Sequence, residues 1–360
     1  MSNRKLDIPS AHRYPFLLSL AVLLSVVAVF RFVEFDWCCC DKSPIDEGYP
    51  DFSIIGWARL VVLALCFFSL TILFSGASSA RVSLGEEKKA WPVYLTGYAL
   101  GALTIFFTLL LWYFPKRFNV LSHEDSLVEW ASFVFLIVSS ALFVIAAFRC
   151  RREEGQRFPW AMLTCAGFVF VFWFVGMEEV SWFQRQIGLE TPDVLFEGNI
   201  QKEFNLHNFF TVGFEILYYF GTFVFFIILP FLRVIFSDWV EQNRYFDTFV
   251  PQPFVAIIGA MSCGYNFEMW NIFPVQSCFV GTVVVLGFFL LASQRLQERV
   301  LICFTGVILV ASQWVFLLGK GRYERIWEVT EYKELFITVG FVAYAISTLR
   351  RILADRRKQF

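Results

Sequence analysis

The sequence predicts an all-α polytopic membrane protein, a transmembrane helical bundle of about ten spans. Of its 360 residues, 58% are hydrophobic and 17% are charged, whereas a soluble domain is about half apolar and about a quarter charged. The mean hydropathy is +0.60. The apolar residues also fall into blocks of about 20, the length that an α-helix needs to cross about 30 Å of hydrocarbon.

We expect one integral membrane domain, residues 1–360, because no connecting segment is long enough to hold a soluble core. The block at 14–33 is interpreted as an uncleaved span, since no small-residue cleavage site follows it. The block at 253–273 is interrupted by polar residues, and Pro274 is expected to end it in a tight turn. The predicted spans are residues 14–33, 54–75, 92–114, 127–148, 158–178, 209–234, 253–273, 275–293, 299–319 and 334–350.

The distribution of Lys and Arg predicts the orientation. With these spans, 19 of the 30 basic residues fall on one side of the membrane and 9 on the other. Cytoplasmic loops carry the excess of Lys and Arg, so both termini are predicted in the cytoplasm. The net charge of −1 gives no reason to expect a nucleic-acid partner, and the lipid bilayer is the expected one.

The ionisable residues inside the predicted spans are the first candidates for a functional site. Each costs about 2.5–3.5 kcal/mol on membrane-insertion scales, so it needs a reason to be there. At 1.5 Å per residue, all of them lie within about 10 Å of the extracytoplasmic boundary. They are Arg31, Arg59, Glu129, Glu178, Glu179, Glu215 and Glu268. Their common depth predicts one polar cavity that opens on that side.

Two further segments add polar groups at the same depth. Asp125 and Glu129 stand four residues apart at the start of a predicted span, so they share one helix face. The loop before the span at 209–234 ends in a dense run of amide, carboxylate and imidazole groups, which includes Asn205 and His207.

These residues carry a resemblance. The run Glu178-Glu179-Val180-Ser181-Trp182-Phe183-Gln184-Arg185, followed by Asn199-x-Gln201-x-Glu203-x-Asn205-Leu206-His207-Asn208, resembles a signature of uncharacterised bacterial multi-pass membrane proteins. Its usual form is E-E-x-S-W-G-Q-R and then N-x-Q-x-E-x-N-L-H-N, so Phe183 stands where Gly is expected. The resemblance implies a bacterial source, and hence the inner membrane, but no particular reaction.

The residues themselves leave several interpretations open. Glu178 and Glu179 fit a general acid/base pair, metal ligands, partners of the two arginines, or carboxylates in headgroup water. A divalent metal held by His207, His123 and Glu179 is an alternative to structural hydrogen bonding of the histidines. The spacing of these residues matches no established zinc pattern.

Three hypotheses from different classes follow. The first is a membrane enzyme that acts on a lipid or lipid-linked substrate; the second is a solute or ion-coupled transporter. The third is a non-catalytic subunit of a membrane complex. For the enzyme, the candidate catalytic residues are Glu178, Glu179, Asp125, Glu129 and His207. The candidate substrate-binding residues are Arg31, Arg59, Glu215, Asn205 and Glu268.

Overall fold

The computed structural model describes residues 48–76, 81–85, 91–123, 125–153, 159–189, 205 and 211–357. Their regular structure is helical, apart from one isolated β-bridge between Val82 and Ser293. Nine helices among these residues are long and apolar enough to cross a membrane, which confirms the predicted all-α polytopic bundle. The predicted first span, 14–33, lies outside the described residues.

The helices follow one another with short connections. The first group is α2 (Ile54–Gly76), α3 (Trp91–Tyr113), α4 (Pro115–Leu121), α5 (Leu127–Glu153), α6 (Pro159–Glu179), η3 (Ser181–Phe183) and α7 (Gln184–Ile187). The second is α8 (Thr211–Phe223), η6 (Val224–Ile228), α9 (Leu229–Ile235), α10 (Ser237–Gln242), α11 (Arg244–Phe249), α12 (Pro253–Gly259), η7 (Ala260–Gly264), α13 (Phe273–Ala292), α14 (Leu296–Leu317) and α15 (Glu328–Arg357). The π-helical turn η6 joins α8 to α9, and together they cover the candidate span Gly213–Ile235.

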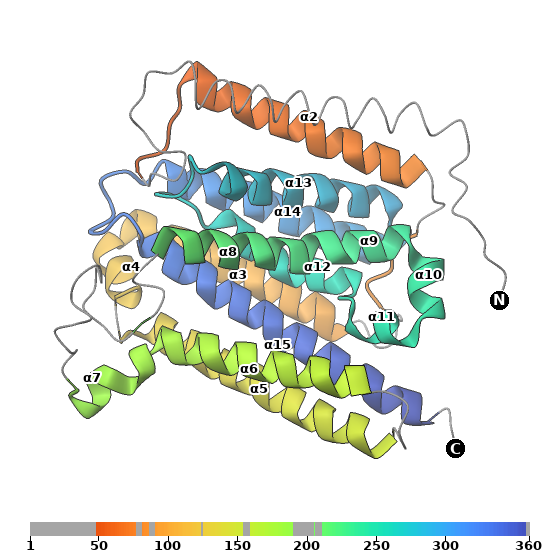
Figure 1. The fold of residues 1–360 in the computed structure, drawn as a ribbon. Coiled ribbons are helices and arrows are strands. Elements are labelled where there is room, and N and C mark those ends of the chain that lie inside the picture. Colours follow the sequence, from red (N-terminus) through yellow and green to blue (C-terminus); the bar gives the residue numbers. More distant parts are fainter. Residues whose placement is uncertain are drawn as a thin grey trace.

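The long helices lie side by side along a common direction, with α2 at one edge and the α5–α6 pair at the other (Figure 1). The helix α15 packs along α5, and α13 packs along α2 and α14. One end of the bundle carries α4 and α7, together with the starts of α5 and α15; we call it the α4 end (Figure 1). The opposite end carries α10 and α11; we call it the α10 end.

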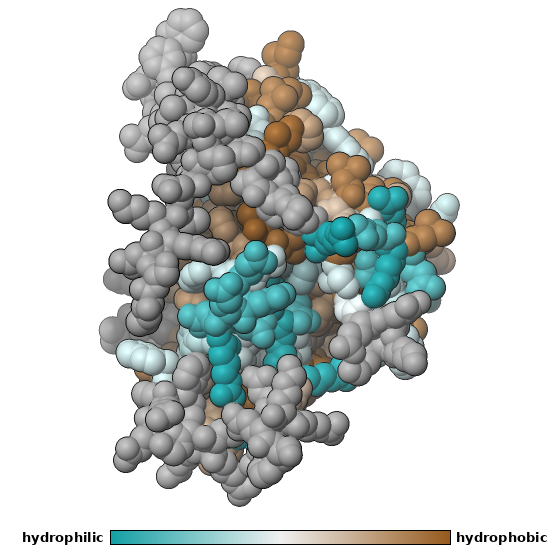
Figure 2. All heavy atoms as spheres, turned by 90° about the vertical axis from the view of Figure 1, so that its right-hand side faces the viewer, coloured by the Kyte–Doolittle hydropathy of each residue, from teal (hydrophilic) through white to brown (hydrophobic). Residues whose placement is uncertain are grey.

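Polar residues cover the middle of the α10 end, while apolar side chains lie beside them (Figure 2). The buried Arg233 connects helices at this end through its hydrogen bonds. Its guanidinium donates to the backbone carbonyls of Asp247 and Val250, at 3.0 and 2.9 Å, and also pairs with the Asp247 carboxylate. Because its partners come from α11 and the residue that follows, Arg233 fixes α11 against α9.

Aromatic rings fill the middle of the bundle. The ring centroids of Phe172 and Phe341 are 4.7 Å apart, and those of Phe226 and Phe341 are 4.9 Å apart. At 1.5 Å per residue, this cluster lies about 10 to 24 Å from the α4 end. Its members are Phe143, Phe168, Phe172, Phe225, Phe226, Phe341 and Tyr344. The described part of the bundle is therefore apolar and closely packed at this depth.

Seven of the predicted spans agree with the described helices to within five residues at each end, and two do not. In the block predicted at 253–273, the helix ends at Gly264, and residues 265–272 are irregular although almost all are buried. Asn266 brings a polar side chain into this segment, and its amide hydrogen-bonds to Gln313 of α14 and Lys333 of α15. Pro274 lies in the first turn of α13, where its missing N–H costs nothing.

The second difference concerns α15, which begins at Glu328 rather than at 334. The predicted span leaves the charged residues before position 334 outside the helix, because they interrupt the apolar run. They are helical because the first turns of α15 lie against other helices that supply polar partners, as described below.

Gly259 on α12 permits close contact with η6. A Cβ atom at this position would lie 2.7 Å from the Cβ of Phe226, so Gly259→Ala is expected to lower the free energy of unfolding by about 1–3 kcal/mol. Gly287→Ala is the control, because no atom lies within 4 Å of a Cβ built there. Thermal unfolding in detergent micelles measures both variants. Equal unfolding temperatures for the two would show that η6 has no such close contact.

Candidate functional site

A buried lysine lies among the polar residues at the α4 end. Lys333, on the second turn of α15, is 3% exposed. Its ammonium donates a hydrogen bond to the side-chain oxygen of Asn266 and lies 4.2 Å from the ring centroid of Tyr219. Glu215 and Glu268 are close enough for their charges to stabilise the ammonium. Such partners are required because removing an ammonium from water costs several kcal/mol.

The amide of Asn266 is held in one orientation by Gln313 of α14. Asn266 Nδ2 donates to Gln313 Oε1 at 2.7 Å, and Gln313 Nε2 donates back to the Asn266 carbonyl at 2.8 Å. Because the amide nitrogen is engaged, the amide oxygen faces Lys333. The irregular segment 265–272 is thus positioned to provide an acceptor for the buried ammonium.

Carboxyl groups from different helices meet at the same end of the bundle. Glu179, the last residue of α6, is within range of charge interaction with Glu129 of α5 and with Glu331 and Glu334 of α15. All four are partly buried. A group of carboxyl groups that influence one another's charge can accept and release protons.

The carboxylate group extends to α8. Glu331 is within range of charge interaction with Glu215. Tyr219, one turn further along α8, donates a hydrogen bond from its hydroxyl to Glu334 Oε1 at 2.8 Å. The candidate site is therefore built by α5, α6, α8 and α15, with Lys333 as its buried cation.

Glu178 and Glu179, although adjacent, have different surroundings. Glu178 is buried and accepts a hydrogen bond of 2.6 Å from the indole nitrogen of Trp182. The turn that places this indole is left-handed, with φ values of 46°, 55° and 58° at Ser181, Trp182 and Phe183. Such values are costly for residues other than glycine. The hydroxyl of Ser181 accepts a hydrogen bond of 2.9 Å from the side-chain nitrogen of Asn205, which is buried.

The predicted pair Asp125 and Glu129 is brought together, but through the backbone. The Glu129 carboxylate accepts a hydrogen bond from the backbone N–H of Asp125 at the start of α5. Asp125 in turn accepts a hydrogen bond of 2.7 Å from the side chain of Gln186 on α7. Asp125 thus joins α5 to α7, and Glu129 closes the first turn of α5 as well as facing Glu179.

The remaining predicted residues divide into two groups. Arg59 on α2 donates a hydrogen bond of 2.7 Å to the backbone carbonyl of Asn271, so it holds the irregular segment in place. Glu268, in the same segment, is 1% exposed and accepts a hydrogen bond from the backbone of Gly48 through its carbonyl. Arg31 and His207 lie outside the described residues.

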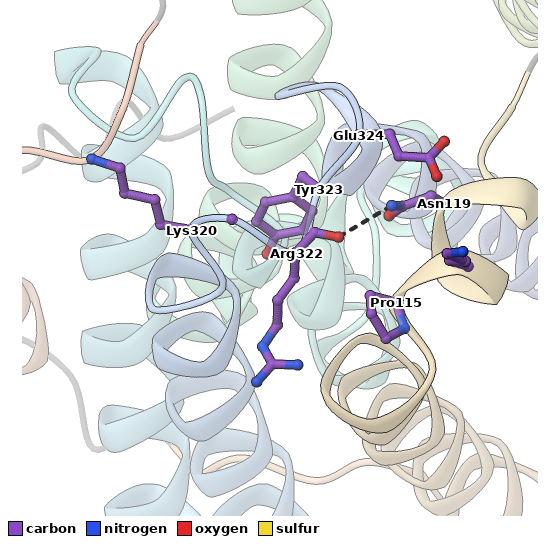
Figure 3. Close-up of a pocket in the computed structure, with 8 residues that line it drawn as sticks. Pro115, Asn119, Lys320, Arg322, Tyr323 and Glu324 are labelled. Carbon is purple, nitrogen blue, oxygen red and sulfur yellow. Dashed lines mark hydrogen bonds between the residues drawn. The ribbon is translucent and has the colours of Figure 1, made fainter.

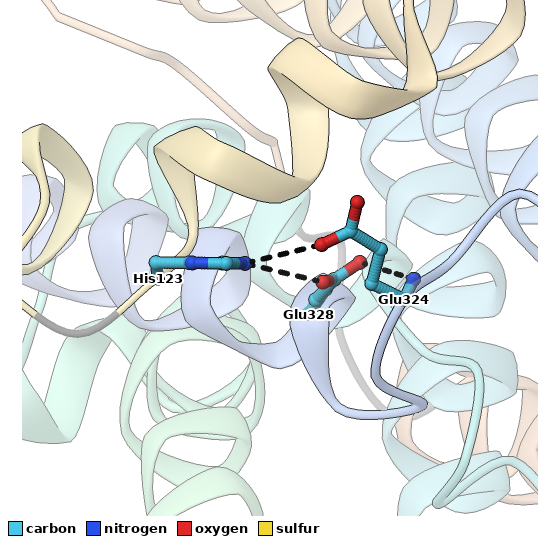
Figure 4. A group of neighbouring side chains, drawn as sticks. All are labelled: His123, Glu324 and Glu328. Carbon is cyan, nitrogen blue, oxygen red and sulfur yellow. Dashed lines mark hydrogen bonds and ion pairs between the residues drawn. The ribbon is translucent and has the colours of Figure 1, made fainter.

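His123 has two carboxylates beside it, and neither is Glu179 (Figure 4). Its Nε2 atom is 3.5 Å from Glu324 Oε2 and 4.0 Å from Glu328 Oε1. Glu328 Oε2 accepts a hydrogen bond of 3.3 Å from the backbone N–H of Glu324. Among the described residues, these three form the group of His, Cys, Asp and Glu side chains close enough to share one metal ion.

A pocket of about 490 Å³ opens at the same end, between α4 and the loop from α14 to α15 (Figure 3). Asn119 fixes its wall, since its side-chain nitrogen donates to the carbonyl of Arg322 at 3.1 Å. Three of the lining residues carry positive charge. The lining residues are Pro115, Lys116, Asn119, Lys320, Gly321, Arg322, Tyr323 and Glu324.

Tyr323 remains a hydrogen-bond donor in this pocket. Burial raises the pKa of its phenol well above the usual value, and the nearby charges of Glu268 and Glu328 raise it further. Its hydroxyl donates to the carbonyl of Phe316 at 2.8 Å. The phenol therefore stays protonated at neutral pH and is not available as a base.

Sequence reasoning missed Glu331, Lys333 and Glu334, and the two carboxylates next to His123. One signal was present: Glu328, Glu331 and Glu334 recur every third residue directly before an apolar run, which places them near one face of a helix. The spacing marks a helix that begins polar and becomes apolar. It does not reveal which other helices that face meets.

A comparison of the chain with protein-family models, curated proteins and solved structures finds no match in any of the three.

Proposed function

We propose that this chain is a membrane-embedded enzyme that acts on a lipid or lipid-linked substrate at the α4 end. One observation carries the proposal: the interacting ionisable groups on α5, α6, α8 and α15 and an open pocket of about 490 Å³ meet at this end. Farther from the α4 end, aromatic rings fill the described bundle. A reactive group near the membrane surface, at the same end of the bundle as an open pocket, suits a substrate with a polar head and an apolar tail.

The arrangement assigns roles within this proposal. Glu179 acts as the general base or acid, because it faces three other carboxylates and has no indole bound to it as Glu178 does. Lys116 and Lys320, exposed at the pocket, hold an anionic head group. They replace Arg59 in that role, since the Arg59 guanidinium is engaged with Asn271.

The transporter hypothesis has one observation in its favour. The helix that begins at Pro253 ends at Gly264, and the irregular residues 265–272 that follow are buried among polar partners, as in many transporters. The aromatic cluster argues against it, because those rings occupy the middle of the described bundle. Uptake of labelled solute into proteoliposomes would support transport over catalysis.

We also propose that the chain belongs to the bacterial multi-pass family whose signature it resembles, in the inner membrane with the α4 end outside. The hydrogen bond between Asn205 and Ser181 supports this proposal, because it connects the two halves of the signature. The excess of Lys and Arg on the opposite side supports the orientation.

The proposal predicts an altered lipid profile in a deletion strain of the source organism. Wild-type protein is expected to restore the profile measured by mass spectrometry. The double variant Lys116→Glu, Lys320→Glu is expected not to, because it places negative charge where an anionic head group would bind. Glu241→Lys, an exposed charge change at the α10 end, is the matched control. An unchanged profile in the deletion strain would contradict the proposal.

A further inference from the structure

We propose that His123, Glu324 and Glu328 form a binding site for a divalent transition-metal ion of the Zn²⁺ class. The proposal goes beyond the proposed function and does not depend on it, since the site is separate from Glu179. The three side chains come from two segments far apart in the sequence. His123 follows α4, and the two glutamates flank the start of α15.

The first argument is the separation of the three ligand atoms. They all lie within 4.8 Å of one another, and His123 Nε2 is 3.5 Å from Glu324 Oε2 and 4.0 Å from Glu328 Oε1. These separations are long for hydrogen bonds, which prefer about 2.7–3.2 Å between N and O. Two ligands at about 2.1 Å from one Zn²⁺ ion are about 3.4 Å apart in tetrahedral geometry. The cluster is therefore spaced for an ion between the side chains rather than for direct bonds.

The second argument is an orphaned, buried carboxylate oxygen. The Glu328 side chain is 0% exposed, yet its Oε1 atom has no hydrogen-bond partner. The atom facing it, His123 Nε2, is also buried and has no hydrogen-bond partner. A buried carboxylate oxygen without a hydrogen bond is costly. A metal ion bound by both atoms would remove that cost.

The third argument is the charge balance. When both glutamates are ionised they contribute two negative charges, and Arg325 offsets one of them, with its Nε 3.8 Å from Glu328 Oε1. The guanidinium of Arg325 is also held by the Ser122 carbonyl, to which it donates at 3.0 Å. With a neutral imidazole, the group carries about one negative charge, which attracts a divalent cation.

The chemistry of the donors selects the class of ion. One imidazole nitrogen and two carboxylate oxygens suit Zn²⁺ and its neighbours, whereas Mg²⁺ prefers oxygen ligands and water. Glu324 and His123 are 52% and 44% exposed, so three protein ligands leave a coordination position open to solvent. Glu324 also lines the pocket of about 490 Å³, so that position is accessible from the pocket.

The test is Zn²⁺ binding by the full chain in detergent micelles, purified without a histidine tag. Cys38, Cys39 and Cys40 are replaced by Ser in every sample, because three adjacent thiols can bind Zn²⁺ themselves. Isothermal titration is expected to give one ion per chain. His123→Ala and Glu328→Gln are each expected to weaken binding at least about tenfold, within the range seen when a ligand or its support is removed.

Glu241→Gln, which removes an exposed carboxylate at the α10 end, is expected to leave Zn²⁺ binding unchanged. X-ray absorption of the loaded protein should show nitrogen and oxygen ligands. Glu328→Gln keeps an oxygen for the Glu324 N–H, so it tests ligation in a folded protein. The proposal is overturned by an absence of stoichiometric binding, by sulfur ligands, or by affinity that is equal in the wild type and the His123→Ala variant.

Discussion

Replacing Lys333 with methionine is expected to lower the free energy of unfolding by about 1.5–3 kcal/mol, the usual contribution of a hydrogen bond to a charged group. Methionine has nearly the same length and removes only the charge and the donor. The carboxylates of Glu215 and Glu268 would then lose the cation that faces them, and the amide oxygen of Asn266 would lose its donor. Thermal or denaturant unfolding in detergent micelles measures the loss.

Two further variants make this prediction specific. Lys116→Met removes an exposed lysine from the same end and is expected to change stability by less than about 0.5 kcal/mol. Adding Glu268→Gln to Lys333→Met should recover part of the loss, because it removes one of the uncompensated charges. If Lys333→Met unfolds at the wild-type temperature, the ammonium is not a structural partner of these carboxylates.

Replacing Glu179 with glutamine is expected to reduce the turnover of the proposed lipid reaction by about 10²–10⁴-fold, the contribution of a positioned general acid or base. The stability of the fold should not decrease. Glu179 faces Glu129, Glu331 and Glu334, so removal of its charge relieves repulsion among like charges. The readout is restoration of the lipid profile in the deletion strain, together with the unfolding temperature of the purified variant.

Glu178→Gln is the matched control, since it makes the same change one residue away. The Glu178 carboxylate accepts the indole N–H of Trp182, and a neutral acceptor there should cost about 1 kcal/mol of stability. Glu178→Gln should therefore lose stability and keep activity, whereas Glu179→Gln should do the reverse. Full activity in the Glu179→Gln variant would exclude Glu179 as the acid or base.

Hydropathy was sufficient to predict most of the bundle, because each lipid-crossing helix must be apolar over its whole length. Hydropathy did not predict the helix limits where a helix is surrounded by protein rather than by lipid. The first turns of α15 carry Lys333 and Glu334 inside the helix, because the segment at 265–272 and α8 supply their partners. Insertion costs alone predict that such residues lie outside the membrane.

The depth of the candidate site in the membrane could be predicted from the sequence, but the full set of residues that form it could not. Glu129, Glu179 and Glu215 were identified because an ionisable residue in an apolar block is unusual, and all three lie within charge range of Glu331 on α15. Glu178 and Arg59 are equally unusual in the sequence. In the structure, however, Glu178 is hydrogen-bonded to Trp182, and Arg59 is hydrogen-bonded to Asn271. A single sequence contains no contacts, so it cannot separate a carboxylate bound to an indole from one that faces other carboxylates.

The irregular connection between η7 and α13 cannot easily change in length. Connections on a protein surface accept insertions and deletions readily because water surrounds them. Residues 265–272 form a connection whose side chains are almost all buried and whose polar groups bind Arg59, Gln313 and Lys333. One added or deleted residue would shift all of these partners out of register at once, so the length of this connection is as constrained as that of a core helix.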